Sequence, residues 1–146
     1  MKVVFGCDHA AVALKDQLLA EMREAGYDCA DLGVAAGETC DYPDMAKALA
    51  EKVAAGEYDR GVLLCGTGIG MSIAANKVPG IRAALVTDCF GAKYTRLHND
   101  ANVCCLGART TGPGLALELL RIFLETPFEG GRHARRVEKI TQMEQR

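Results

Sequence analysis

The chain has 146 residues, long enough for one domain that buries a hydrophobic core without disulfide or metal cross-links. Hydrophobic residues make up 49% and charged residues 25% of the sequence, the balance of a globular protein. The net charge of −2 excludes broad electrostatic attraction to nucleic acid or to an anionic membrane, so any bound anion is expected to be small.

The N-terminal sequence MKVVFGCDHAAVALKD reaches a charged residue at Asp8, before any apolar stretch is long enough for a signal peptide or a membrane span. We therefore expect a cytoplasmic protein that forms a single domain over residues 1–146, with no membrane or nucleic-acid partner.

The seven cysteines form no CxxC pair and no regular framework, which predicts reduced thiols. Cys104 and Cys105 would point to opposite faces of a strand, so both are interpreted as small buried hydrophobic residues. The same interpretation holds for the other cysteines apart from Cys65 and, less clearly, Cys7.

Strand-like apolar runs alternate with helix-length segments along the whole chain. Strands are expected at residues 2–7, 27–33, 60–65, 80–86 and 101–107, and helices at 10–25, 42–55, 70–76, 88–97, 113–125 and from 132 to the end. Asp41 is expected to cap the second helix. Nearly continuous apolar strands separated by helices predict an α/β fold: a five-stranded parallel sheet covered on both faces, in a three-layer α/β/α sandwich.

Polar residues follow three of these strands. Asp8 and His9 follow the first strand, Cys65 to Gly70 follow the third, and Arg109 follows the fifth. Ligands of open parallel sheets bind beyond the carboxyl ends of the strands. The sequence therefore predicts a site along that edge of the sheet.

The segment CGTGIG has the composition of an anion-binding loop. Gly66, Gly68 and Gly70 permit backbone conformations that other residues resist, and they let successive N–H groups turn toward a bound oxygen. Two alternatives remain open: a dinucleotide site in which Asp88, twenty residues beyond Gly68, binds a ribose, and glycines that serve only tight packing. The dinucleotide site leaves Cys65 unexplained, and the helix expected at residues 70–76 is short for such a site.

Cys65 ends a buried strand and is expected to face a helix N-terminus and the amides of the glycine loop. Such surroundings favour a thiolate, which can act as a base or a nucleophile. An amide cradle beside a base suits proton abstraction next to a carbonyl, because the negative charge then develops on an oxygen that the amides can bind.

The C-terminal half supplies further polar residues. His98, Asn99 and Asp100 follow the fourth helix, although a histidine is also stabilised at any helix C-terminus. Arg132 and Arg136 lie one helical turn apart and form a fork suited to a phosphate, unless they belong to an ordinary solvated face.

Two other kinds of protein fit part of this pattern. The same loops would serve a non-catalytic module that binds a nucleotide or a sugar phosphate. A metal site built from Cys7, Asp8, His9 and Cys65 is also conceivable, although consecutive strand residues alternate in direction.

The ordered set of motifs resembles type B ribose-5-phosphate isomerases over nearly the whole chain. The matching segments are GCDHA, DYPD, CGTGIGMSIAANK, GIRAA, HNDANV, GAR and GGRHARRVEKI. The resemblance implies a Rossmann-like homodimer with active sites at the subunit interface, which interconverts ribose 5-phosphate and ribulose 5-phosphate without metal or cofactor. Relatives in the family act on allose 6-phosphate or galactose 6-phosphate.

Residue roles carry over from the resemblance. Cys65 matches the family's base, His98 the residue that opens the sugar ring, and Thr67 a residue that assists at the oxygens. The loop that binds the enediolate and the other substrate contacts match Asp8, His9, Gly66, Gly68, Ile69, Gly70, Asn99, Arg109, Arg132 and Arg136. Asp8 is also expected to take part in catalysis.

Overall fold

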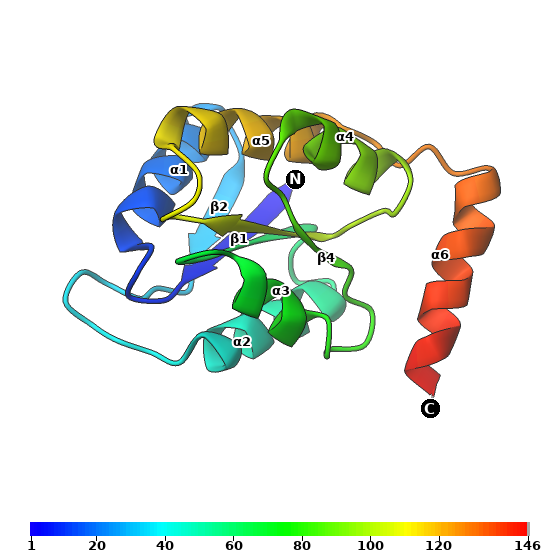
Figure 1. The fold of residues 1–146 in the computed structure, drawn as a ribbon, viewed down its shortest axis with the longest axis horizontal. Coiled ribbons are helices and arrows are strands. Elements are labelled where there is room, and N and C mark those ends of the chain that lie inside the picture. The colour runs from blue at the N-terminus through cyan, green and yellow to red at the C-terminus, as the bar shows by residue number, and fades with distance from the viewer. Residues whose placement is uncertain (146) are drawn as a thin grey trace.

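The computed structural model describes residues 1–145 and contains one parallel sheet in the order β2-β1-β3-β5-β4 (Figure 1). The strands are β1 (Lys2–Cys7), β2 (Asp28–Asp31), β3 (Arg60–Cys65), β4 (Ala83–Leu85) and β5 (Val103–Gly107). Every neighbouring pair is parallel. The predicted five-stranded parallel sheet is confirmed.

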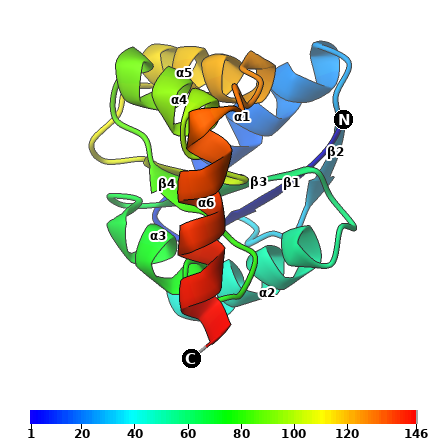
Figure 2. The ribbon, with the colours of Figure 1, turned by 90° about the vertical axis from the view of Figure 1, so that its right-hand side faces the viewer.

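Helices cover both faces of this sheet, which confirms the three-layer architecture (Figures 1 and 2). On one face lie α1 (Val12–Glu24), α4 (Cys89–Leu97) and α5 (Pro113–Glu125), and on the other lie α2 (Tyr42–Ala54) and α3 (Ile69–Ala75). No helix within residues 1–145 has the length and apolar character needed to cross a membrane.

The core has two halves, one on each face of the sheet. Phe5, Leu18 and Phe123 are fully buried between the sheet and α1 and α5, whereas Leu49 and Leu63 are fully buried on the α2 and α3 side. Because β1, β3 and β5 are buried on both faces, their sequences are apolar without alternation. The edge strands β2 and β4 are only partly buried and are shorter than the ranges predicted for them.

The last helix stands apart from the three layers. α6 (Arg132–Gln142) and the short 3-10 helix η1 (Met143–Gln145) follow a link over residues 126–131 and cross the side of the molecule near β4 (Figure 2). His133 is the only buried residue of α6. The helix predicted from Arg132 is confirmed. Its predicted last residue, Arg146, lies outside the described residues.

The strand order reverses direction between β1 and β3. From β1 the chain passes to β2 on one side, and from β3 it passes to β4 on the other, so the connections diverge at the carboxyl ends of these two neighbours. Ligands of open α/β sheets bind at such a switch point.

The two adjacent cysteines of β5 are expected to resist modification in the folded protein. Cys104 and Cys105 are fully buried, and burial raises the pKa of Cys104 to about 12 and that of Cys105 well above its ordinary value. Iodoacetamide at pH 8 should leave both unmodified, because only an accessible thiolate reacts. Peptide mass spectrometry with and without denaturant measures this, and alkylation without denaturant would contradict it.

Candidate active site

The carboxyl ends of β1 and β3 bring Asp8 and Cys65 to the switch point. The Asp8 backbone N–H donates to the Leu64 carbonyl oxygen at 3.2 Å, which continues the pairing of β1 with β3 by one residue. Asp8 is nearly buried, and its Oδ1 accepts a hydrogen bond from the Ala10 N–H at 2.9 Å. The carboxylate is therefore held in place beside the end of β3.

The sulfur of Cys65 lies against the glycine turn, as predicted. Cys65 is the last residue of β3 and is 5% exposed, and its Sγ accepts a hydrogen bond from the Gly68 N–H at 3.1 Å. A backbone donor at this distance stabilises negative charge on sulfur. The direct hydrogen bond matters more than a helix dipole here, because α3 has only seven residues.

Of the three loop glycines, only Gly68 has a positive φ, at +76°. Gly66 and Gly70 permit such a conformation but do not adopt it. Gly70 is needed for space, because a Cβ there would lie 2.6 Å from the Tyr42 ring. A Cβ on Gly107 would lie 2.7 Å from the Thr67 carbonyl group. The turn thus packs directly on the end of β5.

The remaining residues at this edge surround the turn. The Arg109 N–H donates to the Gly66 carbonyl oxygen at 2.9 Å, and a Cβ on Gly66 would lie 3.4 Å from the Arg109 side chain. Thr67 is exposed, and its Oγ1 accepts a hydrogen bond from the Ile69 N–H at 3.3 Å. Arg109 and the hydroxyl of Thr67 can therefore reach a ligand bound over the turn. His9 is exposed and directly follows Asp8.

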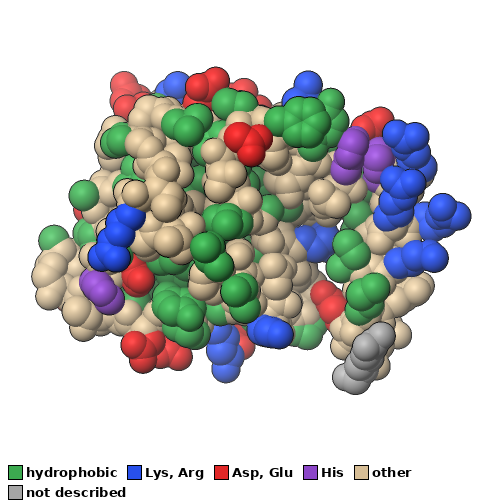
Figure 3. All heavy atoms as spheres, viewed as in Figure 1, with side chains coloured by type: hydrophobic (Ala, Val, Ile, Leu, Met, Phe, Trp, Pro, Cys, Tyr) green, Lys and Arg blue, Asp and Glu red, His purple; other side chains and the backbone are tan. Residues whose placement is uncertain are grey.

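His98, Asn99, Arg132 and Arg136 form a second group elsewhere in the chain. His98 caps the C-terminus of α4, and its ring stacks on that of His133 in α6 with centroids 4.0 Å apart. Arg132 and Arg136 are exposed residues of the same helix as His133. Figure 3 shows a cluster of basic side chains over α6.

This second group lies at the opposite edge of the sheet from Cys65. Cys65 pairs with Gly107 at the carboxyl end of β5, whereas His98 comes before Val103 at its amino end. The two ends of β5 are about 13 Å apart at the usual rise per residue. Figure 3 shows histidine side chains at two opposite ends of the molecule. One chain therefore does not bring Cys65 and His98 together.

A buried arginine holds the segment that carries His98. Arg96 is 2% exposed, and its guanidinium donates to Asp100 Oδ1 at 2.8 Å and to the carbonyl oxygens of Ala101 and Thr126. Asp100 has a φ of +48° and also pairs with Arg82 at 3.2 Å. These bonds tie the end of α4 to the start of the link before α6.

Glu129 is a site residue that the sequence motifs do not predict. Its Oε2 lies 3.7 Å from the Nε2 atoms of both His98 and His133. An exposed glutamate in a connecting segment carries no local signal for such a position. Only the packing of α6 against the end of α4 brings it there.

The structure also bears on the alternatives. Asp88 caps α4 by accepting a hydrogen bond from the Gly91 N–H at 2.7 Å, which accounts for an acid at this position without a bound ribose.

Asp41 occupies the N-cap of α2 as expected, but its side chain makes no capping hydrogen bond. Cys7 packs on the α1 side of the sheet and Cys65 on the α2 side, so the metal site proposed from Cys7, Asp8, His9 and Cys65 is wrong.

These features define a doubly wound α/β protein with a candidate site at the carboxyl ends of β1 and β3. Residues 3–140 match the family model described as Ribose/Galactose Isomerase, and the chain belongs to that family. It is 46% identical to ribose-5-phosphate isomerase B of Escherichia coli over 99% of this chain and 97% of the relative.

Solved structures give the same result. The chain is 48% identical to ribose-5-phosphate isomerase B of Clostridium thermocellum, with a TM-score of 0.97 over 99% of this chain and 98% of that one. It is 50% identical to the type B ribose 5-phosphate isomerase of Trypanosoma brucei, with a TM-score of 0.94 over 97% of each chain. The resemblance seen in the sequence motifs is thereby confirmed.

The close packing of the turn predicts that Gly68→Ala destabilises the protein more than Gly56→Ala. Both glycines have nearly the same φ, at +76° and +77°, so a Cβ adds a similar left-handed strain of about 1–2 kcal/mol at each. At Gly68 the Cβ would also lie 2.9 Å from the Leu106 carbonyl carbon, whereas Gly56 has open space. Overpacking should add about 1–3 kcal/mol at Gly68. Urea unfolding measures the free energy of unfolding of both variants. Equal losses of stability would contradict the close packing of the turn.

Proposed function

We propose that this chain is an aldose–ketose isomerase that interconverts D-ribose 5-phosphate and D-ribulose 5-phosphate by proton transfer through a cis-enediolate, without a metal or organic cofactor. Its place in the Ribose/Galactose Isomerase family supports the reaction class. The observation that carries the mechanism is the 3.1 Å contact between the sulfur of Cys65 and the Gly68 N–H.

Cys65 is the proposed base. As a thiolate it removes the proton from C2 of the open-chain aldose, and the electron pair moves to the carbonyl oxygen to give the enediolate. Backbone N–H groups of residues 66–70, with the Thr67 hydroxyl, bind the oxygen that gains charge. A proton passes from the C2 hydroxyl to the oxygen on C1, the Cys65 thiol returns its proton to C1, and the ketose forms.

The other roles follow the family resemblance. His98 transfers the proton that opens the furanose ring. Asp8, His9 and Asn99 bind sugar hydroxyls and the phosphate, and Arg109, Arg132 and Arg136 complete the phosphate site. Arg132 and Arg136 make no ion pair with another described residue, which leaves both guanidinium groups available to an anion.

A second copy of the chain is proposed to complete the site. Cys65 and His98 lie at opposite edges of one sheet, whereas the reaction needs both at one sugar. A two-fold symmetric dimer solves this, because the edge that carries Cys65 of one subunit then faces the edge that carries His98 of the other, twice. We also propose that the protein is cytoplasmic and that residues 1–146 form a single domain.

Six-carbon substrates remain the second candidate, because the family description includes galactose isomerases. Steric pockets discriminate one extra carbon unit only modestly. Values of kcat/KM for ribose 5-phosphate and allose 6-phosphate, measured on the same preparation, decide between them. A higher value for allose 6-phosphate would reassign the substrate and leave the chemistry unchanged.

Replacing the base should abolish turnover without unfolding the protein. Cys65→Ala is expected to lower kcat about 100- to 10,000-fold, because proton abstraction is lost while the binding residues remain. Cys29→Ser is the matched control, since Cys29 is a half-buried thiol on the edge strand β2. A Cys65→Ala protein with normal kcat would remove Cys65 from the mechanism.

Hydrogen exchange in heavy water distinguishes an isomerase from a module that only binds the sugar phosphate. The wild type should incorporate deuterium at C1 or C2 of its sugar phosphate, because the abstracted proton exchanges with solvent at the thiol. Mass spectrometry of the recovered sugar measures the exchange. A chain that binds the sugar without any exchange would be a sensor rather than an enzyme.

Mixing two inactive variants tests the shared site. In mixed dimers of Cys65→Ala and His98→Asn, one site carries both changes and the other carries neither. Random pairing should therefore restore about a quarter of the wild-type activity, since half of the dimers are mixed and each has one intact site. Cys65→Ala mixed with Asp8→Asn is the control, because both residues lie at one edge and no site is intact. Mixed dimers of the first pair without activity would contradict the arrangement.

A further inference from the structure

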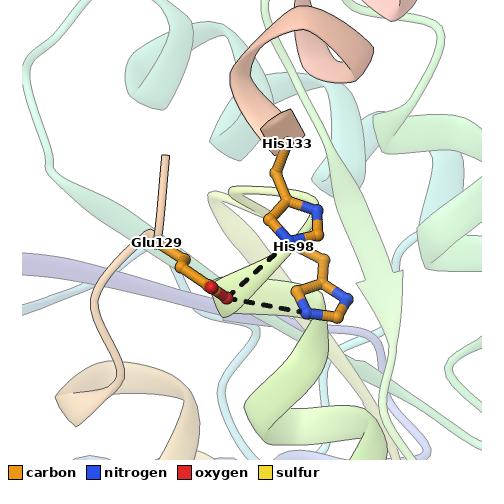
Figure 4. Close-up of side chains that lie close together, drawn as sticks. All are labelled: His98, Glu129 and His133. Atoms are coloured by element: carbon orange, nitrogen blue, oxygen red, sulfur yellow. Dashed lines mark ion pairs between the residues drawn. The ribbon is translucent and has the colours of Figure 1, made fainter. Parts of the chain in front are cut away.

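Three metal-binding side chains from three separate segments meet at the junction between α4 and α6. His98 comes from the end of α4, Glu129 from the link, and His133 from the first turn of α6 (Figure 4). Glu129 Oε2 lies 3.7 Å from each Nε2, and the ligand atoms of all three residues lie within 4.8 Å of one another. Among the described residues, this is the only such group of three.

The buried nitrogen of His133 has no partner. Its side chain is 4% exposed, and its Nε2 makes no hydrogen bond within residues 1–145, because 3.7 Å to Glu129 is too long. Buried polar atoms are nearly always satisfied, so an unpaired one points to a missing ligand. Burial lowers the pKa of His133, the charges of His98, Arg132 and Arg136 act in the same direction, and the charge of Glu129 opposes them.

We propose that His98, Glu129 and His133 form a binding site for a divalent transition-metal ion such as Zn²⁺. Tetrahedral coordination with bonds of about 2.0–2.1 Å places neighbouring ligand atoms about 3.4 Å apart. The two nitrogen–oxygen separations of 3.7 Å nearly meet this requirement. The two imidazoles must rotate out of their stacked arrangement so that both nitrogens face one ion, and His98, 36% exposed at a helix end, has room to do so.

The ligand types select the ion. Two imidazoles and one carboxylate favour zinc, cobalt, nickel or copper over magnesium and calcium, which prefer oxygen ligands. Arg132 and Arg136 oppose a cation, but both are exposed and their charges are screened by water and salt. Three protein ligands leave one coordination position for water.

Binding would have two consequences. An ion held by His98 and His133 fixes α6 to the end of α4, in addition to the hydrogen bonds between Glu144 and Gly80. It also occupies a ring nitrogen of His98, the residue proposed to open the sugar ring, so the ion is expected to inhibit the enzyme. The inhibition rests on the proposed function, whereas the binding does not.

Cobalt binding tests the site directly. The metal-free full chain is titrated with Co²⁺ alone and followed by visible absorption, and Zn²⁺ is then added to displace it. We expect one Co²⁺ per chain with a tetrahedral spectrum and no sulfur-to-cobalt charge-transfer band. Glu129→Gln and His133→Asn should each weaken binding at least about tenfold. Glu125→Gln, an exposed acid outside the cluster, should change nothing.

Three results would overturn the site. These are no cobalt spectrum at millimolar Co²⁺, equal affinity in the Glu129→Gln protein, or a sulfur-to-cobalt band, which would place the ion on a cysteine. Glu129 is 55% exposed, so Glu129→Gln should keep the fold and give a decisive result even where His133→Asn does not fold.

An activity measurement tests the inhibition separately. Zn²⁺ should inhibit the wild type, and a chelator should restore its activity. Inhibition of the Glu129→Gln protein should need a Zn²⁺ concentration at least about tenfold higher. Equal inhibition of the two proteins would place the inhibitory ion elsewhere, for example on Cys65. A chain without isomerase activity would refute the proposed function, and the cobalt titration would still decide the metal site.

Discussion

The contact between the Cys65 sulfur and the Gly68 N–H depends on how closely one turn packs on two strand ends. The turn must reverse within three residues, which the positive φ of Gly68 allows, and it must lie on β5, which the missing side chain of Gly107 allows. A Cβ at either position would push the amide away from the sulfur. The site is therefore a product of backbone packing, and the apolar sheet beneath it supplies the rigidity.

The direction of the strands explains why the polar residues form two groups. In a parallel sheet each strand ends at one edge, and each crossover helix returns the chain to the other. Residues that follow strands, such as Asp8 and Cys65, share the first edge, and residues that follow α4, such as His98, lie at the second. Hydrogen bonds of Arg96 to Asp100 and neighbouring carbonyl oxygens hold the segment that carries His98. Two half-sites on opposite edges suit assembly between two copies.

The sequence predicted the elements that local chemistry determines. The central strands were evident because burial on both faces leaves long apolar runs, and Cys65 was placed correctly because a strand ending in CGTG can only turn there. The short edge strands β2 and β4 were overestimated, since partial burial weakens the pattern. The strand order, the space that Gly70 gives to Tyr42 and the position of Glu129 depend on contacts between distant segments, which no local pattern contains.

The two roles proposed for His98, ring opening and metal binding, would compete. Opening a sugar ring needs an imidazole that exchanges a proton freely, and its partial exposure allows this. Its Nε2 lies beside a carboxylate and a second imidazole, which is the ligand set that a transition metal selects. In the free chain the two rings are stacked, an orientation in which their nitrogens do not both face one ion. An ion must therefore supply enough binding energy to rotate His98, and a bound sugar phosphate that engages His98 and the nearby arginines would oppose that rotation.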